Sequence, residues 1–151
     1  MPEGYGVPGT DEGILDWSWA TERLEPALTY WFSTTRPDGR PHAMPAWGVW
    51  LDDALYFEGS PATRRARNLA DNPELVVHLE SGDETVILEG LAEPVLDAEV
   101  ERGVDEAYGA KYDFTPDSSG EADPWFAVHP RRAYVWTESG YPGSATQFDF
   151  D

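Results

Sequence analysis

The residues best suited to chemistry are three arginines within four positions, in the stretch Thr63-Arg64-Arg65-Ala66-Arg67. Just before it, Ser60 suits the N-cap of a helix and Pro61 its first position, and we predict that helix over Ala62 to Ala70. A helix N-terminus already carries partial positive charge and unpaired N–H groups, so arginines are unfavourable there unless an anion lies nearby. With the hydroxyls of Ser60 and Thr63, these groups favour a phosphate site. The alternative is a solvated helix face whose arginines pair with surrounding carboxylates.

A second candidate segment is Met44-Pro45-Ala46-Trp47-Gly48-Val49-Trp50, in which Pro45 and Gly48 both weaken a regular strand. Proline removes a hydrogen-bond donor, and glycine admits close approach to the backbone. A flat ligand could therefore lie against the strand edge, with Trp47 or Trp50 as a wall. The alternative is a bulged barrel strand whose tryptophans belong to the core.

Other familiar catalytic and metal-binding patterns are missing from the sequence. His42, His78 and His129 lack the spacing of metal ligands, and we expect a solvent-exposed or core role for each. No Gly-x-Ser-x-Gly, Gly-x-Gly-x-x-Gly or Walker-type segment occurs, so hydrolysis, a Rossmann site and a nucleoside triphosphate site have no support. The chain has no cysteine, which excludes disulfides, thiolate nucleophiles and iron–sulfur ligation. We interpret the acidic run Asp117 to Asp123 as a solvated loop.

Short strands and small helices must position the two candidate segments. Apolar spacing predicts helices over about Trp17 to Glu25 and Asp97 to Tyr108, with a polar, irregular segment over Gly109 to Asp123. The predicted strands are Tyr30 to Thr35, His42 to Leu51, Ala54 to Glu58, Glu74 to Glu80, Thr85 to Pro94, Phe126 to Val128 and Arg132 to Thr137. Short turns predict that the first three of these form a meander, and a Gly- and Asp-containing tail runs from Glu138 to Asp151. Six or so strands with small helices indicate a closed or nearly closed antiparallel barrel.

Length and composition limit which classes of partner and function are possible. The 151 residues carry 29 acidic and 10 basic side chains, a formal net charge of -19, which excludes nucleic acids and anionic membrane surfaces as favourable partners. We expect a flexible lead-in at residues 1–13 and a single domain over residues 14–151. The N-terminus has no signal-peptide pattern and no run of about 18 apolar residues occurs, so we expect a cytoplasmic protein.

The order and spacing of several segments resemble the pyridoxamine 5'-phosphate oxidase-like family, in particular its flavin and deazaflavin (coenzyme F420) dependent oxidoreductase branch. The similarity covers about Trp17 to Val95, and a weaker similarity extends from Pro130 to Phe148. The segments that carry it are Tyr30-Trp31-Phe32-Ser33-Thr34-Thr35, Asp38-Gly39-Arg40-Pro41-His42, Met44 to Leu51, Ala54-Leu55-Tyr56-Phe57, Arg64-Arg65-Ala66-Arg67-Asn68-Leu69 and Asn72-Pro73.

The resemblance implies an antiparallel split β-barrel of the FMN-binding, Greek-key type, forming a homodimer with two cofactor sites at the subunit interface. It places the cofactor phosphate around Ser60, Thr63, Arg64 and Arg65, with Arg65 where the family often has lysine. It places the cofactor ring beside the strand matched by Met44 to Gly48, largely through backbone groups, and our candidates there are Pro45, Ala46 and Trp47. The tail departs from the branch: Ala145-Thr146-Gln147-Phe148 stands where an Ala-Thr-Arg-aromatic stretch is frequent.

The resemblance and the arginine cluster together lead us to expect an oxidoreductase that binds F420 or FMN and transfers a hydride to or from a small organic substrate. The cofactor would carry the redox chemistry, so no side-chain acid or base is assigned. An alternative from another class is a split-barrel protein that binds a flavin or F420 for storage, sensing or protection without turnover. A third keeps the barrel and the dimer but has lost the cofactor.

Overall fold

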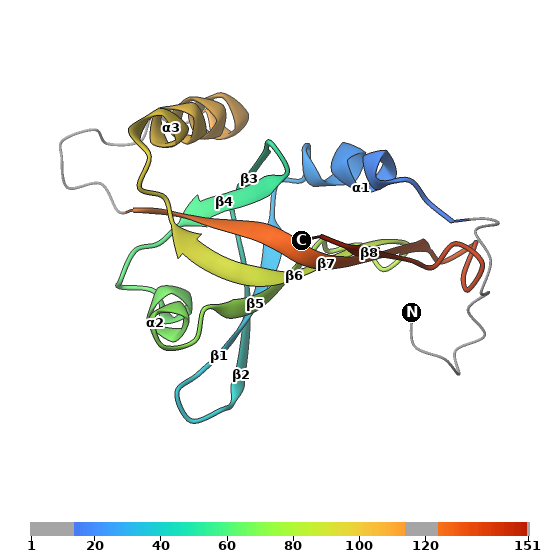
Figure 1. The fold of residues 1–151 in the computed structure, drawn as a ribbon, viewed down its shortest axis with the longest axis horizontal. Coiled ribbons are helices and arrows are strands. Elements are labelled where there is room, and N and C mark those ends of the chain that lie inside the picture. Colours follow the sequence, from blue (N-terminus) through green and yellow to red (C-terminus); the bar gives the residue numbers. More distant parts are fainter. Residues whose placement is uncertain (1–13, 114–123, 151) are drawn as a thin grey trace.

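The computed structural model of the protein describes residues 14–113 and 124–150. These residues form three helices and eight strands, and every strand pair is antiparallel (Figure 1). The elements are α1 (Trp17–Leu24), β1 (Tyr30–Thr35), β2 (Pro41–Ala46), β3 (Val49–Leu51), β4 (Ala54–Glu58), α2 (Arg64–Asp71), β5 (Glu74–His78), β6 (Glu84–Pro94), α3 (Ala98–Tyr112), β7 (Trp125–Thr137) and β8 (Thr146–Asp149). The expected lead-in at residues 1–13 and the acidic run at 117–123 lie outside the described residues. None of the three helices is long and apolar enough to cross a membrane.

The strands form one curled sheet in the order β2-β1-β5-β6-β7-β4-β3, with β8 beside β7. β2 and β3 are the two ends of this order, yet only Trp47 and Gly48 separate them in the chain. Three Cα–Cα steps from Ala46 to Val49 span at most about 11 Å, so the sheet must curl until its two ends meet. This half-barrel agrees with the expected split β-barrel.

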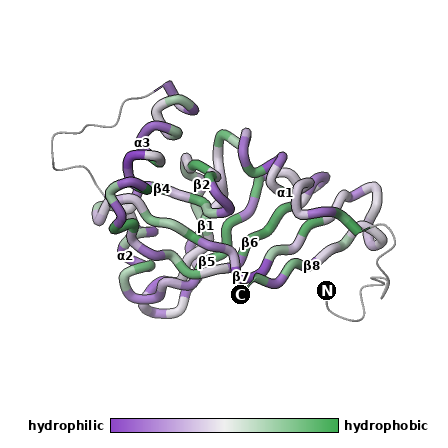
Figure 2. The backbone as a smooth tube through the Cα atoms, turned by 45° about the horizontal axis from the view of Figure 1, so that its top comes forward, coloured by the Kyte–Doolittle hydropathy of each residue, from purple (hydrophilic) through white to green (hydrophobic). Residues whose placement is uncertain are grey.

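The concave side of the sheet holds the core. In β1, Tyr30, Phe32 and Thr34 are buried, whereas the alternate residues are half-buried on the outer side, as the period of two for a strand requires. The main cluster also takes Ala20 and Leu24 from α1. A second cluster under α3 contains Val49, Ala54, Tyr56, Val104, Tyr108, Trp125 and Ala127. α3 is thereby packed over the β3–β4 end of the sheet (Figures 1 and 2).

Several predicted boundaries are wrong, and the most consequential lies at Trp47-Gly48. The predicted strand from His42 to Leu51 is two strands, β2 and β3, and the predicted meander does not form, because β2 pairs with β1 whereas β3 pairs with β4. α2 begins at Arg64 and not at Ala62, because the side chain of Thr63, and not that of Ser60, caps the helix.

The C-terminal half contains longer elements than predicted. α3 continues four residues past Tyr108, to Tyr112. The two short predicted strands at 126–128 and 132–137 are one strand, β7, and a register shift between Glu89 and Gly90 in β6 accommodates the intervening segment. The tail supplies β8, so the described residues hold eight strands, where the sequence predicts six or so.

Candidate functional site

The predicted site residues lie on two segments. Pro45, Ala46 and Trp47 lie at the end of β2, and Ser60, Thr63, Arg64 and Arg65 lie at the start of α2. Residues that pair directly across antiparallel strands project to the same side of the sheet, and His42, Met44 and Ala46 lie opposite buried β1 residues. They therefore lie on the concave side, and we call them the β2 face. Met44 lies opposite Phe32, which is 1% exposed, yet Met44 itself is 52% exposed. The concave side of the barrel is thus open to solvent along the β2 face.

The His42 end of the β2 face is cationic. Burial lowers the pKa of His42, and the neighbouring charges of Arg36, Arg64 and Arg65 lower it further. The Nδ1 atom of His42 is buried and has no hydrogen-bond partner. Because three of the chain's ten basic side chains act on one imidazole, this end of β2 would attract an anion.

Arg65 is the buried member of this cluster, with 7% of its surface exposed. One guanidinium N–H donates to the carbonyl oxygen of Glu58 at 3.1 Å, and the group lies over the rings of Phe32 at 4.9 Å and Phe57 at 5.3 Å. Burial lowers the pKa of Arg65, whereas the charge of Glu58 acts in the opposite direction. Its Nε atom is buried without a partner. A buried cationic donor that lacks an acceptor fits a phosphate oxygen as its missing partner.

The other predicted phosphate ligands are placed unequally. Arg64 is exposed at the first position of α2. The Thr63 hydroxyl is already engaged, since it donates to the Ser60 carbonyl at 2.8 Å and accepts from the Ala66 N–H at 3.1 Å. The Ser60 hydroxyl accepts a longer bond of 3.3 Å from the Ala62 N–H. The structure therefore brings Arg64 and Arg65 to His42, while Thr63 acts first as a helix cap.

The other end of the β2 face is aromatic. Trp47 is 47% exposed, and its indole stacks on the ring of Tyr112 from α3, with centroids 4.4 Å apart and planes 2° apart. Ala46 lies on the β2 face, whereas Pro45 lies opposite Trp31 on the outer side of the sheet. Of the two tryptophans considered as a wall, Trp50 is a core residue, so only Trp47 is available.

Gly48 allows the chain to turn from β2 into β3 at this point. A Cβ atom there would lie 3.1 Å from a ring carbon of Tyr30 and 3.2 Å from both Leu55 and the Tyr56 carbonyl oxygen. Only glycine fits without displacing these neighbours. The close approach expected of Gly48 is thus made by the protein's own core.

The cationic and aromatic ends lie on one face at a defined separation. Ala46 follows His42 by four positions, and at about 3.3 Å per residue the two ends are about 13 Å apart. This arrangement suits an elongated ligand that carries an anion at one end and a flat ring at the other. Among residues 14–113 and 124–150, no group of three or more His, Asp or Glu side chains is placed to hold a metal ion.

Three site residues were missed or misjudged from the sequence. His42 was expected in an unspecific solvent or core role, although the period of two places it on the same face as Met44 and Ala46. Arg36 precedes the hairpin turn and approaches His42 only because β1 and β2 pair, and its guanidinium donates to the Pro41 carbonyl at 3.0 Å. Tyr112 is distant in sequence, and nothing in its spacing indicates contact with Trp47.

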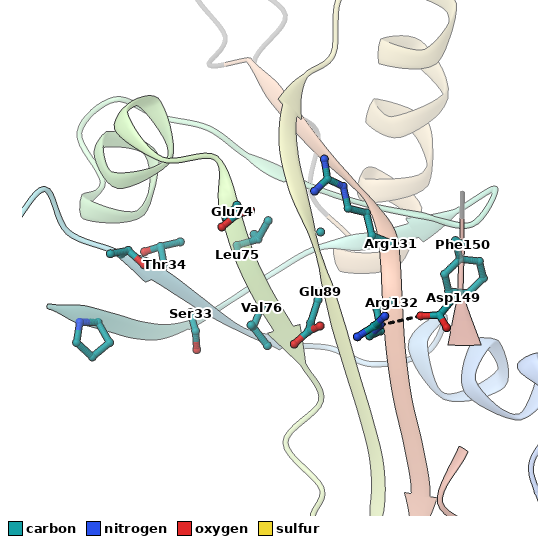
Figure 3. Close-up of a pocket in the computed structure, with 13 residues that line it drawn as sticks. Ser33, Thr34, Glu74, Leu75, Val76, Glu89, Arg131, Arg132, Asp149 and Phe150 are labelled. Atoms are coloured by element: carbon teal, nitrogen blue, oxygen red, sulfur yellow. Dashed lines mark hydrogen bonds and ion pairs between the residues drawn. The ribbon is translucent and has the colours of Figure 1, made fainter. Parts of the chain in front are cut away.

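A cavity of about 710 Å³ lies elsewhere, and no predicted site residue lines it (Figure 3). It is lined from β1, β2, β5, β6, β7 and β8, and Figure 3 shows Arg132 between Glu89 and Asp149. Arg132 forms an ion pair with Asp149 at 2.7 Å. Ser33, Val76, Glu89 and Arg132 share one cross-strand row on the outer side of the sheet. His42, Met44 and Ala46 do not line this cavity.

Comparison with known proteins decides the family. A sequence model described as pyridoxamine 5'-phosphate oxidase matches residues 20–137. The chain belongs to this family. The match includes the β2 face, α2 and the whole sheet except β8. A comparison with curated protein sequences gave no match.

Many solved structures share the fold of this pyridoxamine 5'-phosphate oxidase family member. A conserved hypothetical protein from Mycobacterium tuberculosis has a TM-score of 0.74 at 22% identity, covering 93% of this chain and 97% of that one. General Stress Protein 26 from Bacillus anthracis has a TM-score of 0.68 at 17% identity, covering 88% and 97%. An F420 reductase has a TM-score of 0.57 at 22% identity, covering 88% and 98%. At these identities the structures establish the split-barrel fold.

Proposed function

We propose that the protein binds FMN or coenzyme F420 on the β2 face and transfers a hydride between that cofactor and a small organic substrate. The observation that carries the proposal is the cationic end of β2, where Arg65 Nε and His42 Nδ1 are buried without partners. Family membership supports the same ligand class, and one structural neighbour is an F420 reductase. Neither line of support distinguishes the two cofactors.

Each end of the β2 face has a separate task in this proposal. Arg64 and Arg65 hold the cofactor phosphate, and the buried guanidinium of Arg65 contributes more per bond because it is shielded from water. The ring lies toward Ala46, where Trp47 limits its position on one side. The bound cofactor supplies the hydride chemistry, while the protein orients it and shelters one of its faces.

The outer side of the sheet supports the proposed homodimer. Trp31, His78, Ile87 and Tyr134 form one cross-strand row there and are only partly buried within one chain. Trp31 and His78 stack with planes 7° apart, which gives a flat, largely apolar surface. A second copy on this side would cover the row and the adjoining cavity. Sedimentation analysis of the parent and of Ile87→Glu tests this: a dimer that Ile87→Glu converts to folded monomer is expected, and a monomeric parent would refute it.

Titrations with FMN and with F420, each in moderate and in high salt, test the cofactor proposal. Because the net charge is -19 and both cofactors are anions, salt should screen the general repulsion and strengthen binding at a locally favourable site. Absence of binding to either cofactor would refute the proposal. If a cofactor binds, its reduced form is then offered a series of small organic acceptors. Reoxidation coupled to reduction of an acceptor supports an oxidoreductase, whereas a bound cofactor that no acceptor reoxidises supports the storage or sensing alternative.

A further inference from the structure

The only lysine of the chain, Lys111, lies at the junction of β2 and β3. Its ammonium donates to the Gly48 carbonyl oxygen at 2.9 Å and to the Tyr30 hydroxyl at 2.9 Å. It also lies 4.9 Å from the centre of the Tyr30 ring and 5.3 Å from that of Tyr112. A residue near the end of α3 thus contacts the turn between the two ends of the sheet.

Tyr112 completes the attachment of α3 to this turn. Its hydroxyl accepts from the Gly48 N–H at 3.0 Å and donates to the Leu28 carbonyl at 2.8 Å. Both backbone polar groups of Gly48 are therefore bound by side chains of α3. The same Tyr112 ring carries the stacked indole of Trp47. The orientation of Trp47 consequently depends on the contacts that α3 makes with Gly48.

We propose that Lys111 is a positioning residue that, through Gly48 and Tyr112, holds the Trp47 indole at the aromatic end of the β2 face. The consequence for a cofactor ring rests on the proposed function, whereas the consequence for Trp47 itself does not. Trp47 is fixed on one side by Tyr112 and exposed on the other, so its free surface is available for a flat ring.

The partly buried charge of Lys111 lowers the free energy of unfolding, because burial disfavours the charged form of the amine. Burial lowers the pKa of Lys111 to about 8, against the opposing effect of Glu25. The titratable and charged groups facing it are Glu25, Tyr30 and Tyr112, and burial raises the pKa of both tyrosines. Lys111 is therefore the member of this group whose charge changes near pH 8. A neutral amine makes weaker hydrogen bonds than an ammonium. The hydrogen bond from Lys111 to the Gly48 carbonyl oxygen therefore weakens above this pH.

Fluorine NMR of the 5-fluorotryptophan-labelled protein without cofactor tests the proposal directly. Trp47→Phe identifies the Trp47 resonance by its disappearance. In the parent protein this resonance should shift with a midpoint near pH 8. Lys111→Met should abolish the titration and displace the resonance at pH 7, and Lys111→Arg should restore the pH 7 position with no midpoint below pH 10. The matched control is Arg102→Met, which removes an exposed positive charge from the same helix.

The outcomes separate this proposal from that of cofactor binding. A Trp47 resonance that does not titrate in the parent protein, or that is unchanged in Lys111→Met, would overturn the positioning role. If Trp47 responds as expected, riboflavin binding should weaken by about 2- to 10-fold in Lys111→Met and stay unchanged in Arg102→Met, as loss of one ordered aromatic contact predicts. A titrating Trp47 in a protein that binds neither FMN nor F420 would support the role of Lys111 and refute the proposed function.

Discussion

Replacing Arg65 with methionine should remove binding of the cofactor phosphate while leaving the fold nearly as stable as before. Methionine fills much of the same volume between Phe32 and Phe57 without a charge. The variant loses one charged hydrogen bond to the Glu58 carbonyl, which contributes about 1.5–3 kcal/mol. It also removes a buried N–H that has no acceptor, which costs about 1–3 kcal/mol in the parent. These terms oppose each other, so the free energy of unfolding should change by less than about 2 kcal/mol.

In FMN binding, no favourable term offsets the loss of the hydrogen bond from Arg65 to the phosphate. Loss of a charged hydrogen bond to phosphate of about 1.5–3 kcal/mol corresponds to an affinity for FMN about 10- to 150-fold weaker. Riboflavin, which has the same ring but no phosphate, should bind Arg65→Met as it binds the parent. The control is Arg67→Met on the same helix, because Arg67 is exposed and bonds only weakly, at 3.4 Å, to the Thr63 carbonyl.

The assays are flavin fluorescence titration with FMN and riboflavin, and urea unfolding followed by tryptophan fluorescence. If Arg65→Met weakens FMN and riboflavin equally, Arg65 does not bind the phosphate. If the variant loses more than about 3 kcal/mol of unfolding free energy, Arg65 is a structural residue of the core and its unpartnered Nε does not mark a phosphate site.

Four further predictions concern single residues. Gly48→Ala should lower the free energy of unfolding by about 1–3 kcal/mol in urea, because the added methyl group meets the Tyr30 ring at 3.1 Å. A bound phosphate should raise the lowered pKa of His42, so FMN should bind more tightly when His42 is protonated. FMN affinity should therefore increase as the pH falls toward the lowered pKa of His42, by at most about tenfold per pH unit, and calorimetry in two buffers should detect less proton uptake in His42→Asn. Asp97→Ala should destabilise the protein by about 1 kcal/mol in urea, because the Asp97 carboxylate caps α3. The pKa of Lys111 falls from 10.5 to about 8 on folding, so the unfolded chain holds that proton more tightly. The free energy of unfolding of the parent should therefore rise as the pH increases from about 8 to 10.5, and it should rise less in Lys111→Met.

Much of the site could be found in the sequence because its signals are local. The arginine cluster after Ser60 stands out against 29 acidic residues, and Pro45 and Gly48 mark an interrupted strand whatever its neighbours are. The period of two along β2 is sufficient to place His42 on the same side of the sheet as Met44 and Ala46. The order of short strands and turns likewise predicted an antiparallel barrel, although the meander expected of the first three strands does not form.

Only the tertiary structure decided which of these groups meet. The sequence could not show that Arg65 is buried between two phenylalanines while Arg64 is exposed, since both begin the same helix and only packing against β1 and β4 separates them. It could not show that the strand predicted through Trp47 divides there between the two ends of the sheet, because that division depends on long-range pairing. Nor could it place Lys111 and Tyr112 on Gly48, more than 60 residues away along the chain. Local patterns determined the residue types of the site, and closure of the sheet determined their geometry.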